Sequence, residues 1–163
     1  MPRIKPVWRA ASRDSNPSSA SRVKAIDARW EHFPHGADIG IRGIGPTLDA
    51  AFEQVALALT AVLVPPDRVA SRDVVEVSCE ASSSEDLLYD WIDALIFEMA
   101  MRNMVFSTFE VHIDGTRLTA RLFGEPVDRA RHEPAIEVKS PTYTELRVAH
   151  EDAGWVAQCV VDV

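Results

Sequence analysis

The stretch Trp30-Glu31-His32-Phe33-Pro34-His35-Gly36-Ala37-Asp38-Ile39-Gly40-Ile41-Arg42-Gly43 decides the fold. A proline–histidine–glycine turn separates two predicted short strands, Arg29–Phe33 and Ala37–Gly43. In the second strand isoleucines alternate with Asp38 and a glycine, so one face is apolar and the other carries a carboxylate. Because a strand holds its side chains in fixed directions, this carboxylate can be aimed at a ligand or at another segment of the chain.

The last nine residues predict a strand that reaches the end of the sequence, where Asp162 adjoins the α-carboxylate of Val163. We predict that Asp38 and this terminus meet. Three anionic groups would repel one another and raise each other's pKa unless a cation joined them. Calcium, magnesium or manganese suits such an all-oxygen set, whereas zinc prefers nitrogen or sulfur. The alternative is that Asp38 accepts backbone hydrogen bonds at a strand end and that Asp162 is simply solvated.

A histidine, His35, lies three residues before Asp38. It is a candidate for a further ligand or for a group that orients Asp38, and the alternative is a turn histidine that bonds to the backbone. His32 is predicted to be structural. The sequence has no Gly-x-Ser-x-Gly nucleophile elbow and no Gly-x-x-x-x-Gly-Lys phosphate loop, so acyl-transfer and phosphate-loop chemistry have no support.

The rest of the chain alternates helical and strand patterns. Apolar stripes and capping signals predict helices over 48–63 and 85–102. Alternation predicts strands over 74–79, 109–113 and 118–122, the last two joined by an Asp114-Gly115 hairpin turn. Further strands are expected over 135–139, over 143–149 and from 155, with a polar loop over 124–134. This order predicts an α+β two-layer sandwich, in which a largely antiparallel sheet is covered on one face by two helices.

The charge is unevenly distributed along the 163 residues. Residues 1–25 contain six basic residues and one acid, so they carry +5; the whole chain carries −8, so residues 26–163 carry −13. We expect a disordered basic leader over 1–25, followed by one domain over 26–163. A body this acidic repels a phosphate backbone, so contact with RNA is expected only through another protein or at a shielded site.

Two further features concern the location of the protein. Its cysteines, Cys79 and Cys159, lie in apolar runs without metal-ligand spacing and are predicted to be buried and inert. No apolar run is long enough to span a membrane, and the N-terminus lacks the apolar block of a secretory signal. The sequence therefore favours a cytoplasmic protein without a membrane partner.

Five segments, in this order along residues 30–163, resemble motifs of the archease family. They are His35-Gly36-Ala37-Asp38-Ile39-Gly40, Asp86-Leu87-Leu88-Tyr89-Asp90-Trp91-Ile92, Gly124-Glu125-Pro126-Val127-Asp128 with His132-Glu133 after it, Glu137-Val138-Lys139-Ser140-Pro141-Thr142-Tyr143, and the Val161-Asp162-Val163 end. The resemblance covers the whole chain except the leader, and each motif is short on its own.

The resemblance implies a small, non-catalytic metal-binding protein that assists an RtcB-type, GTP-dependent tRNA-splicing ligase. Archeases promote guanylylation of that ligase and let it turn over repeatedly. The family's metal ligands correspond to Asp38, Asp162 and the terminal carboxylate of Val163. Lys139 and Tyr143 match family positions and are candidates for contact with the partner.

Two rival classes of function stay open at this point. One is a metal-dependent hydrolase that uses Asp38 and Asp162 around the same cation. The other is a general chaperone that binds exposed apolar surface, modulates an RNA-modifying enzyme and has no need of Asp38.

Overall fold

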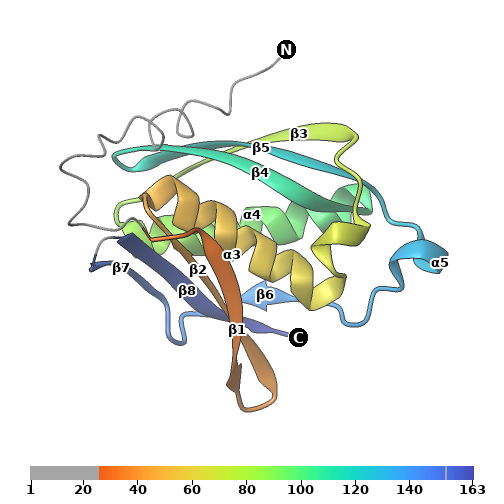
Figure 1. The fold of residues 1–163 in the computed structure, drawn as a ribbon, viewed down its shortest axis with the longest axis horizontal. Coiled ribbons are helices and arrows are strands. Elements are labelled where there is room, and N and C mark those ends of the chain that lie inside the picture. The colour runs from red at the N-terminus through yellow and green to blue at the C-terminus, as the bar shows by residue number, and fades with distance from the viewer. Residues whose placement is uncertain (1–25, 153) are drawn as a thin grey trace.

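The computed structural model describes residues 26–152 and 154–163, so the predicted leader lies outside the described residues (Figure 1). The elements are β1 (Arg29–His35), β2 (Asp38–Gly45), α3 (Leu48–Leu63), η1 (Pro66–Arg68), β3 (Asp73–Glu80), α4 (Ser84–Arg102), β4 (Met104–Asp114), β5 (Arg117–Pro126), α5 (Arg129–His132), β6 (Ser140–Pro141), β7 (Arg147–Glu151) and β8 (Gly154–Asp162). No helix in these described residues is long and apolar enough to cross a membrane.

The strands form two antiparallel sheets with the long helices between them (Figure 1). One sheet has the order β1-β2-β8, with β6 and β7 both paired to the far side of β8; the other has the order β3-β5-β4. The α+β class and the antiparallel pairing are therefore confirmed. The layering differs from the single covered sheet that we expected, because α3 buries residues around most of its circumference and needs cover on two sides.

Helix α3 begins and ends at the residues that the sequence predicted. The Thr47 hydroxyl accepts a hydrogen bond from the backbone N–H of Ala50 at 3.0 Å, which satisfies one unpaired donor of the first turn. A Pro65-Pro66 pair follows the last turn, where proline disfavours a further helical residue. The predicted stripe is buried throughout: it consists of Phe52, Val55, Leu59 and Val62.

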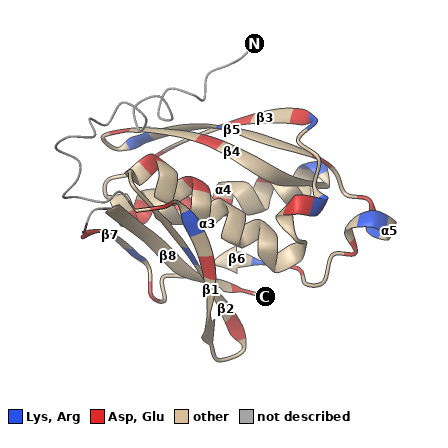
Figure 2. Ribbon diagram, viewed as in Figure 1, with Lys and Arg blue, Asp and Glu red and all other residues tan. Residues whose placement is uncertain are grey.

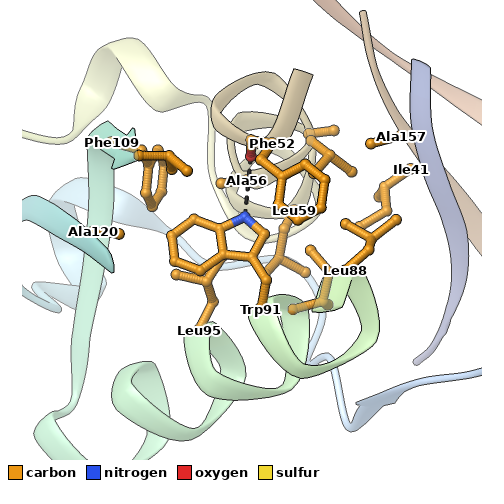
Figure 3. Packing of buried hydrophobic residues seen from close by; sticks show 14 of the residues in the cluster. Ile41, Phe52, Ala56, Leu59, Leu88, Trp91, Leu95, Phe109, Ala120 and Ala157 are labelled. Carbon is orange, nitrogen blue, oxygen red and sulfur yellow. Dashed lines mark hydrogen bonds between the residues drawn. The ribbon is translucent and has the colours of Figure 1, made fainter. Parts of the chain in front are cut away.

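Helix α4 supplies the centre of the core. The Ser83 hydroxyl caps its first turn by accepting a hydrogen bond from the backbone N–H of Asp86 at 3.1 Å. Trp91 is fully buried, donates its indole N–H to the Phe52 carbonyl at 3.0 Å and meets Phe109 edge-to-face, so one side chain joins both helices and a strand (Figure 3). The apolar stripe predicted for 85–102 consists of Leu88, Ile92, Leu95 and Met99. It did not include this tryptophan, because a polar partner for the indole becomes available only after the helices pack.

Two carboxylates of α3 pair with the free edge of β4. The backbone N–H groups of Val111 and Ile113 donate to Glu53 and Asp49, at 2.8 Å and 3.0 Å. Asp49 and Glu53 are one helical turn apart, a rise that matches the two-residue spacing of Val111 and Ile113 along the strand. The two carboxylates thus occupy backbone donors on an edge strand that could otherwise pair with another chain. Burial raises the pKa of Asp49, while the bond from Ile113 opposes that rise.

The segments between the main elements correct several expectations. Residues 135–139 are not a strand, since only isolated backbone bonds hold them, and β7 begins at Arg147 rather than at 143 because residues 143–146 form a turn. Residues 124–126 belong to β5 instead of a loop, and a short helix follows them. The first hairpin turns at Gly36-Ala37, and the β4–β5 hairpin at Gly115-Thr116; the glycine has positive φ in both.

Gly43 of β2 lies directly against the backbone of α3, which leads to a prediction about stability. A Cβ there would lie 2.2 Å from the Ala51 carbonyl oxygen and from the Val55 nitrogen, both backbone atoms of the helix. We expect Gly43→Ala to lower the free energy of unfolding by about 1–3 kcal/mol, because the helix must move away from the sheet. Urea unfolding measures the loss, with exposed Thr119→Ala as the control; equal stability of the two variants would contradict the packing.

Candidate functional site

The structure brings Asp38 and Asp162 to opposite positions on adjacent antiparallel strands. The register pairs Ile39 with Val161, so each aspartate is the next residue along its own strand. The flanking Ile39 and Val161 pack against the core, and alternation therefore places both aspartates on the outer face of the sheet. Side chains at such opposite positions lie about 4.5–5.5 Å apart at Cβ. The prediction that these two segments meet is confirmed by this register.

The facing carboxylates of Asp38 and Asp162 lie without a protein partner as far as residues 26–152 and 154–163 show. In the part of the chain that the structure describes, no hydrogen bond or ion pair holds the side chain of Asp38 or Asp162. Like charges directly opposite one another on adjacent strands destabilise a sheet. Because none of the described backbone N–H groups donates to the Asp38 carboxylate, the alternative in which Asp38 accepts backbone hydrogen bonds has no support in the structure. The oxygen donors present fit a hard divalent cation, since a cation would remove the repulsion.

His35 lies across the hairpin from Asp38, at the last position of β1. Within residues 26–152 and 154–163, no three side chains of His, Cys, Asp or Glu form a group suited to hold a metal. His35 thus does not complete a three-side-chain ligand set with Asp38 and Asp162. His32, predicted to be structural, places its Nε2 atom 2.8 Å from the Ala58 carbonyl oxygen of α3.

Val163 follows directly from the strand that carries Asp162. Its side chain is half-buried and packs against the core, on the inner face of the sheet. This contact fixes the last residue, and Figure 1 shows the C-terminus beside the β1–β2 hairpin that holds Asp38. Val163 is the next residue after Asp162, which stands opposite Asp38 by the register of β2 and β8.

The two predicted partner-contact residues lie on the other side of β8. The backbone N–H of Lys139 donates to the Asp162 carbonyl oxygen at 2.8 Å, and its side chain is exposed. Tyr143 is 67% exposed and stacks on Tyr89 of α4, with ring centroids 4.4 Å apart. The segment that carries both residues thus runs along the strand end that carries the aspartates, and it leaves both side chains accessible to a partner.

An aromatic ring supports the outer face next to Asp38. Phe33 lies over Gly40, where a Cβ would come within 2.3 Å of the ring, and the Arg42 guanidinium sits 4.6 Å from the ring centroid. Arg42 is held in turn by Glu31 at 2.5 Å and by Gln158 at 2.9 Å. Sequence reasoning missed this network, because the pairing of Phe33 with Gly40 depends on the hairpin register.

A second cluster surrounds the buried carboxylate of Glu125, at the end where α5 shows its basic residues in blue (Figure 2). Glu125 accepts from both terminal nitrogens of Arg131 at 2.8 and 2.9 Å, and from the Ala70 N–H at 2.8 Å. The Asp128 N–H donates to Nδ1 of His132, so Nε2 carries the ring proton and donates to Glu125 at 2.9 Å. This cluster fixes the loop after β5.

These bonds make the stability of the fold depend on pH. The Arg131 guanidinium, followed by the Ala70 N–H, holds the pKa of Glu125 well below its usual range. The stabilisation is therefore complete above the carboxyl's unfolded pKa, about 4.3, and is lost as the pH falls below it. We expect Glu125→Gln to lower the free energy of unfolding by about 2 kcal/mol at pH 7. We expect that difference to shrink below about pH 4.

Denaturant unfolding across pH 3–7 measures this difference between the parent and the variant. Glu80→Gln is the matched control, because Glu80 pairs with Arg117 on the surface, where both side chains are more than 60% exposed. Surface pairs contribute little, so the control should stay within about 0.5 kcal/mol of the parent at every pH. If the difference in free energy of unfolding between the parent and Glu125→Gln does not change with pH, the charge of Glu125 does not contribute to stability.

The two thiols are not candidates for chemistry near neutral pH. Cys159 is fully buried and Cys79 half-buried. Burial raises the pKa of Cys159 to about 12. Burial, with smaller contributions from Asp90 and Asp93, raises the pKa of Cys79 to about 11. Both thiols stay protonated and therefore unreactive, as predicted, although Cys79 is less buried than expected.

The fold and the site define a small α+β protein with two facing carboxylates at a strand end, and comparisons identify its family. The family model described as "Archease protein family (MTH1598/TM1083)" matches residues 30–163. The archeases of Pyrococcus abyssi and Thermococcus gammatolerans are 42% and 43% identical over 140 residues, covering 83% of this chain and 99% of each relative. The chain belongs to the archease family.

Solved structures agree with the fold. The solution structure of Methanobacterium thermoautotrophicum protein 1598 superposes with a TM-score of 0.74 at 30% identity, covering 82% of this chain and 98% of that one. The crystal structure of a Thermotoga maritima protein, described as an archease and possible chaperone, gives a TM-score of 0.50 at 16% identity. This second likeness supports the fold alone.

Proposed function

We propose that this chain is a metal-binding accessory protein that activates an RtcB-type, GTP-dependent RNA ligase and catalyses no step itself. Membership of the archease family supports the accessory role. The observation that carries the metal-binding part is the pair of facing carboxylates, Asp38 and Asp162, which have no protein cation among residues 26–152 and 154–163. A pair of this kind is costly to the fold unless a ligand compensates it.

The ligands proposed for the cation are Asp38, Asp162 and the α-carboxylate of Val163. The bound cation supplies positive charge at an otherwise anionic strand end. The protein's own contribution is to hold these oxygens on a rigid sheet, with Phe33 beside them and Lys139 on the neighbouring segment. Because residues 26–163 carry −13, contact with RNA is assigned to the ligase and not to this chain.

The test is a multiple-turnover ligation assay with the RtcB-type ligase from the same genome. The substrates are an RNA with a 2′,3′-cyclic phosphate end and an RNA with a 5′-hydroxyl end, with GTP and a divalent cation. At limiting ligase, the chain should raise product well above one ligation per ligase molecule. Unchanged turnover would reject the proposal.

Two control reactions separate the rival functions. The metal-loaded chain is incubated with RNA and with phosphate esters in the absence of ligase, where release of phosphate or strand cleavage would indicate a hydrolase. An unrelated protein is heated with the chain, where protection from aggregation that does not require Asp38 would indicate a general chaperone. The proposed function predicts no effect in either reaction.

The identity of the cation gives a separate prediction. Calorimetric titration should detect binding of calcium, magnesium or manganese in preference to zinc, because the donors are oxygens. Affinity should fall as the pH drops from 7 to about 4, since protons compete with the cation for carboxylate oxygens. Preferential binding of zinc would instead make His35 a primary ligand and reject the all-oxygen site.

A further inference from the structure

One face of α4, which no other described element covers, carries a stripe that is acidic in its first half and apolar in its second. Helical spacing of three and four residues places its members in a line, which we name the α4 stripe: Asp86, Asp90, Asp93, Phe97, Ala100 and Met101. All six are exposed, whereas the opposite face of the helix is buried against both sheets. The line is about 22 Å long.

The acidic half of the stripe lacks a compensating charge in the part of the chain that the structure describes. Among the described residues, no Lys, Arg or His forms an ion pair with Asp86, Asp90 or Asp93. The helix dipole accounts for Asp86 in the first turn, but not for the other two, because the dipole effect fades within a turn. Partial burial, and then the neighbouring carboxylates, raise the pKa of Asp90. The same helix does pair Glu98 with Arg102 near its end, so its charges elsewhere are satisfied.

The apolar half of the stripe exposes large side chains. Phe97 is 57% exposed and Met101 68% exposed, and they lie one turn apart on the same line as the carboxylates. Next to the acidic half, the stacked pair of Tyr89 and exposed Tyr143 extends the surface toward the segment that carries Lys139. Aromatic side chains and methionine are enriched in the cores of protein interfaces.

We infer that the α4 stripe is the docking surface for a partner protein that presents Lys or Arg side chains beside an apolar contact. Charge complementarity decides the occupant. Nucleic acid is excluded because carboxylates repel phosphates. A second copy of this domain would bring residues of a −13 body, and the same carboxylates, against the stripe. The inference rests on the proposed function, since an RNA-binding ligase is a partner with basic surface.

The acidic half of the α4 stripe is tested by measuring how tightly the full chain binds the ligase from the same genome. The stripe variant is Asp90→Lys with Asp93→Lys. The control is Asp67→Lys with Asp73→Lys, which makes the same change in net charge at exposed positions outside α4. We expect Kd to rise at least tenfold for the stripe variant and less than threefold for the control. The association rate of the stripe variant should also lose much of its dependence on salt.

The apolar half has its own pair of variants. Phe97→Ser should weaken binding about tenfold, because an exposed aromatic anchor is lost without opening a core cavity. Val74→Ser is the control, since Val74 is an apolar residue of β3, outside the α4 stripe, with a similar exposed fraction of 48%. Melting temperatures of all variants are compared with the parent, so that a folding defect is recognised.

The outcomes separate this inference from the proposed function. If the stripe variant binds like the parent, or if it and its control lose affinity equally, the α4 stripe is not the docking surface, although the ligase remains the partner. If the parent chain shows no binding to the ligase, the proposed function fails and this assignment of the partner fails with it. Loss confined to the stripe variant and Phe97→Ser supports the inference.

Discussion

Replacing Asp38 with asparagine is expected to abolish stimulation of the ligase and to weaken metal binding at least about 100-fold, without unfolding the protein. The carboxylate lies on the outer face of β2, opposite Asp162, so its replacement opens no cavity in the core. It also removes one of two like charges that face each other, which should raise the free energy of unfolding of the metal-free protein by about 0.2–1 kcal/mol. Loss of function with unchanged or higher stability is therefore the expected signature.

The control for this variant is Asp73→Asn. Asp73 is the first residue of β3, as Asp38 is of β2, but it lies in the other sheet and is exposed. It should leave metal affinity, ligase stimulation and stability unchanged. Calorimetric titration, the ligation assay and urea unfolding are applied to both variants. If Asp38→Asn binds the cation and stimulates the ligase like the parent, Asp38 is not part of the site.

Adding one glycine after Val163 is expected to be as damaging as replacing Asp38. The new peptide bond converts an anionic carboxylate into a neutral carbonyl, so the proposed cation loses about one unit of compensating charge. The displaced carboxylate moves about 3.5 Å farther along the chain. The Val163 side chain already packs against the core, so the extension cannot be absorbed by sliding the strand inward.

Two controls isolate the terminal charge from other effects. Val163→Ala keeps the carboxylate and removes most of the side chain, so it should cost some stability but retain metal binding. A glycine placed before Met1 lengthens the chain by the same amount, outside the residues 30–163 that match the family. If the C-terminal extension binds the cation and stimulates the ligase as well as the parent does, the terminal carboxylate is not a ligand.

Much of the local structure was predictable because its causes lie within a few residues. Helix α3 runs over the predicted span, since a capping threonine precedes it and two prolines follow it. The β4–β5 hairpin follows from alternation around a glycine turn, shifted by one residue. Where local signals were weak, the expectation was wrong: residues 135–139 have strand-like composition but form no ladder, because no neighbouring strand pairs along them.

The residues proposed for the candidate site come from the sequence, whereas their surroundings could not be predicted from it. The sequence alone pointed to Asp38, Asp162 and the terminal carboxylate, because each is an anion at a strand end. Whether the two aspartates face one another depends on the β2–β8 register, which joins segments more than 100 residues apart. The position of the Phe33 ring over Gly40 and the exposure of Phe97 also depend on which surfaces other elements cover.

By itself, the sequence determined the class of fold, the bounds of α3 and the chemistry of the candidate ligands, since these follow from periodicity, capping and residue type. Only the tertiary structure decided that the strands divide into two sheets around the helices, because that outcome requires α3 to bury opposite sides at once. It also decided that Asp38 and Asp162 stand opposite each other with no protein cation among the described residues, because pairing between distant strands sets the register and hence which side chains become neighbours.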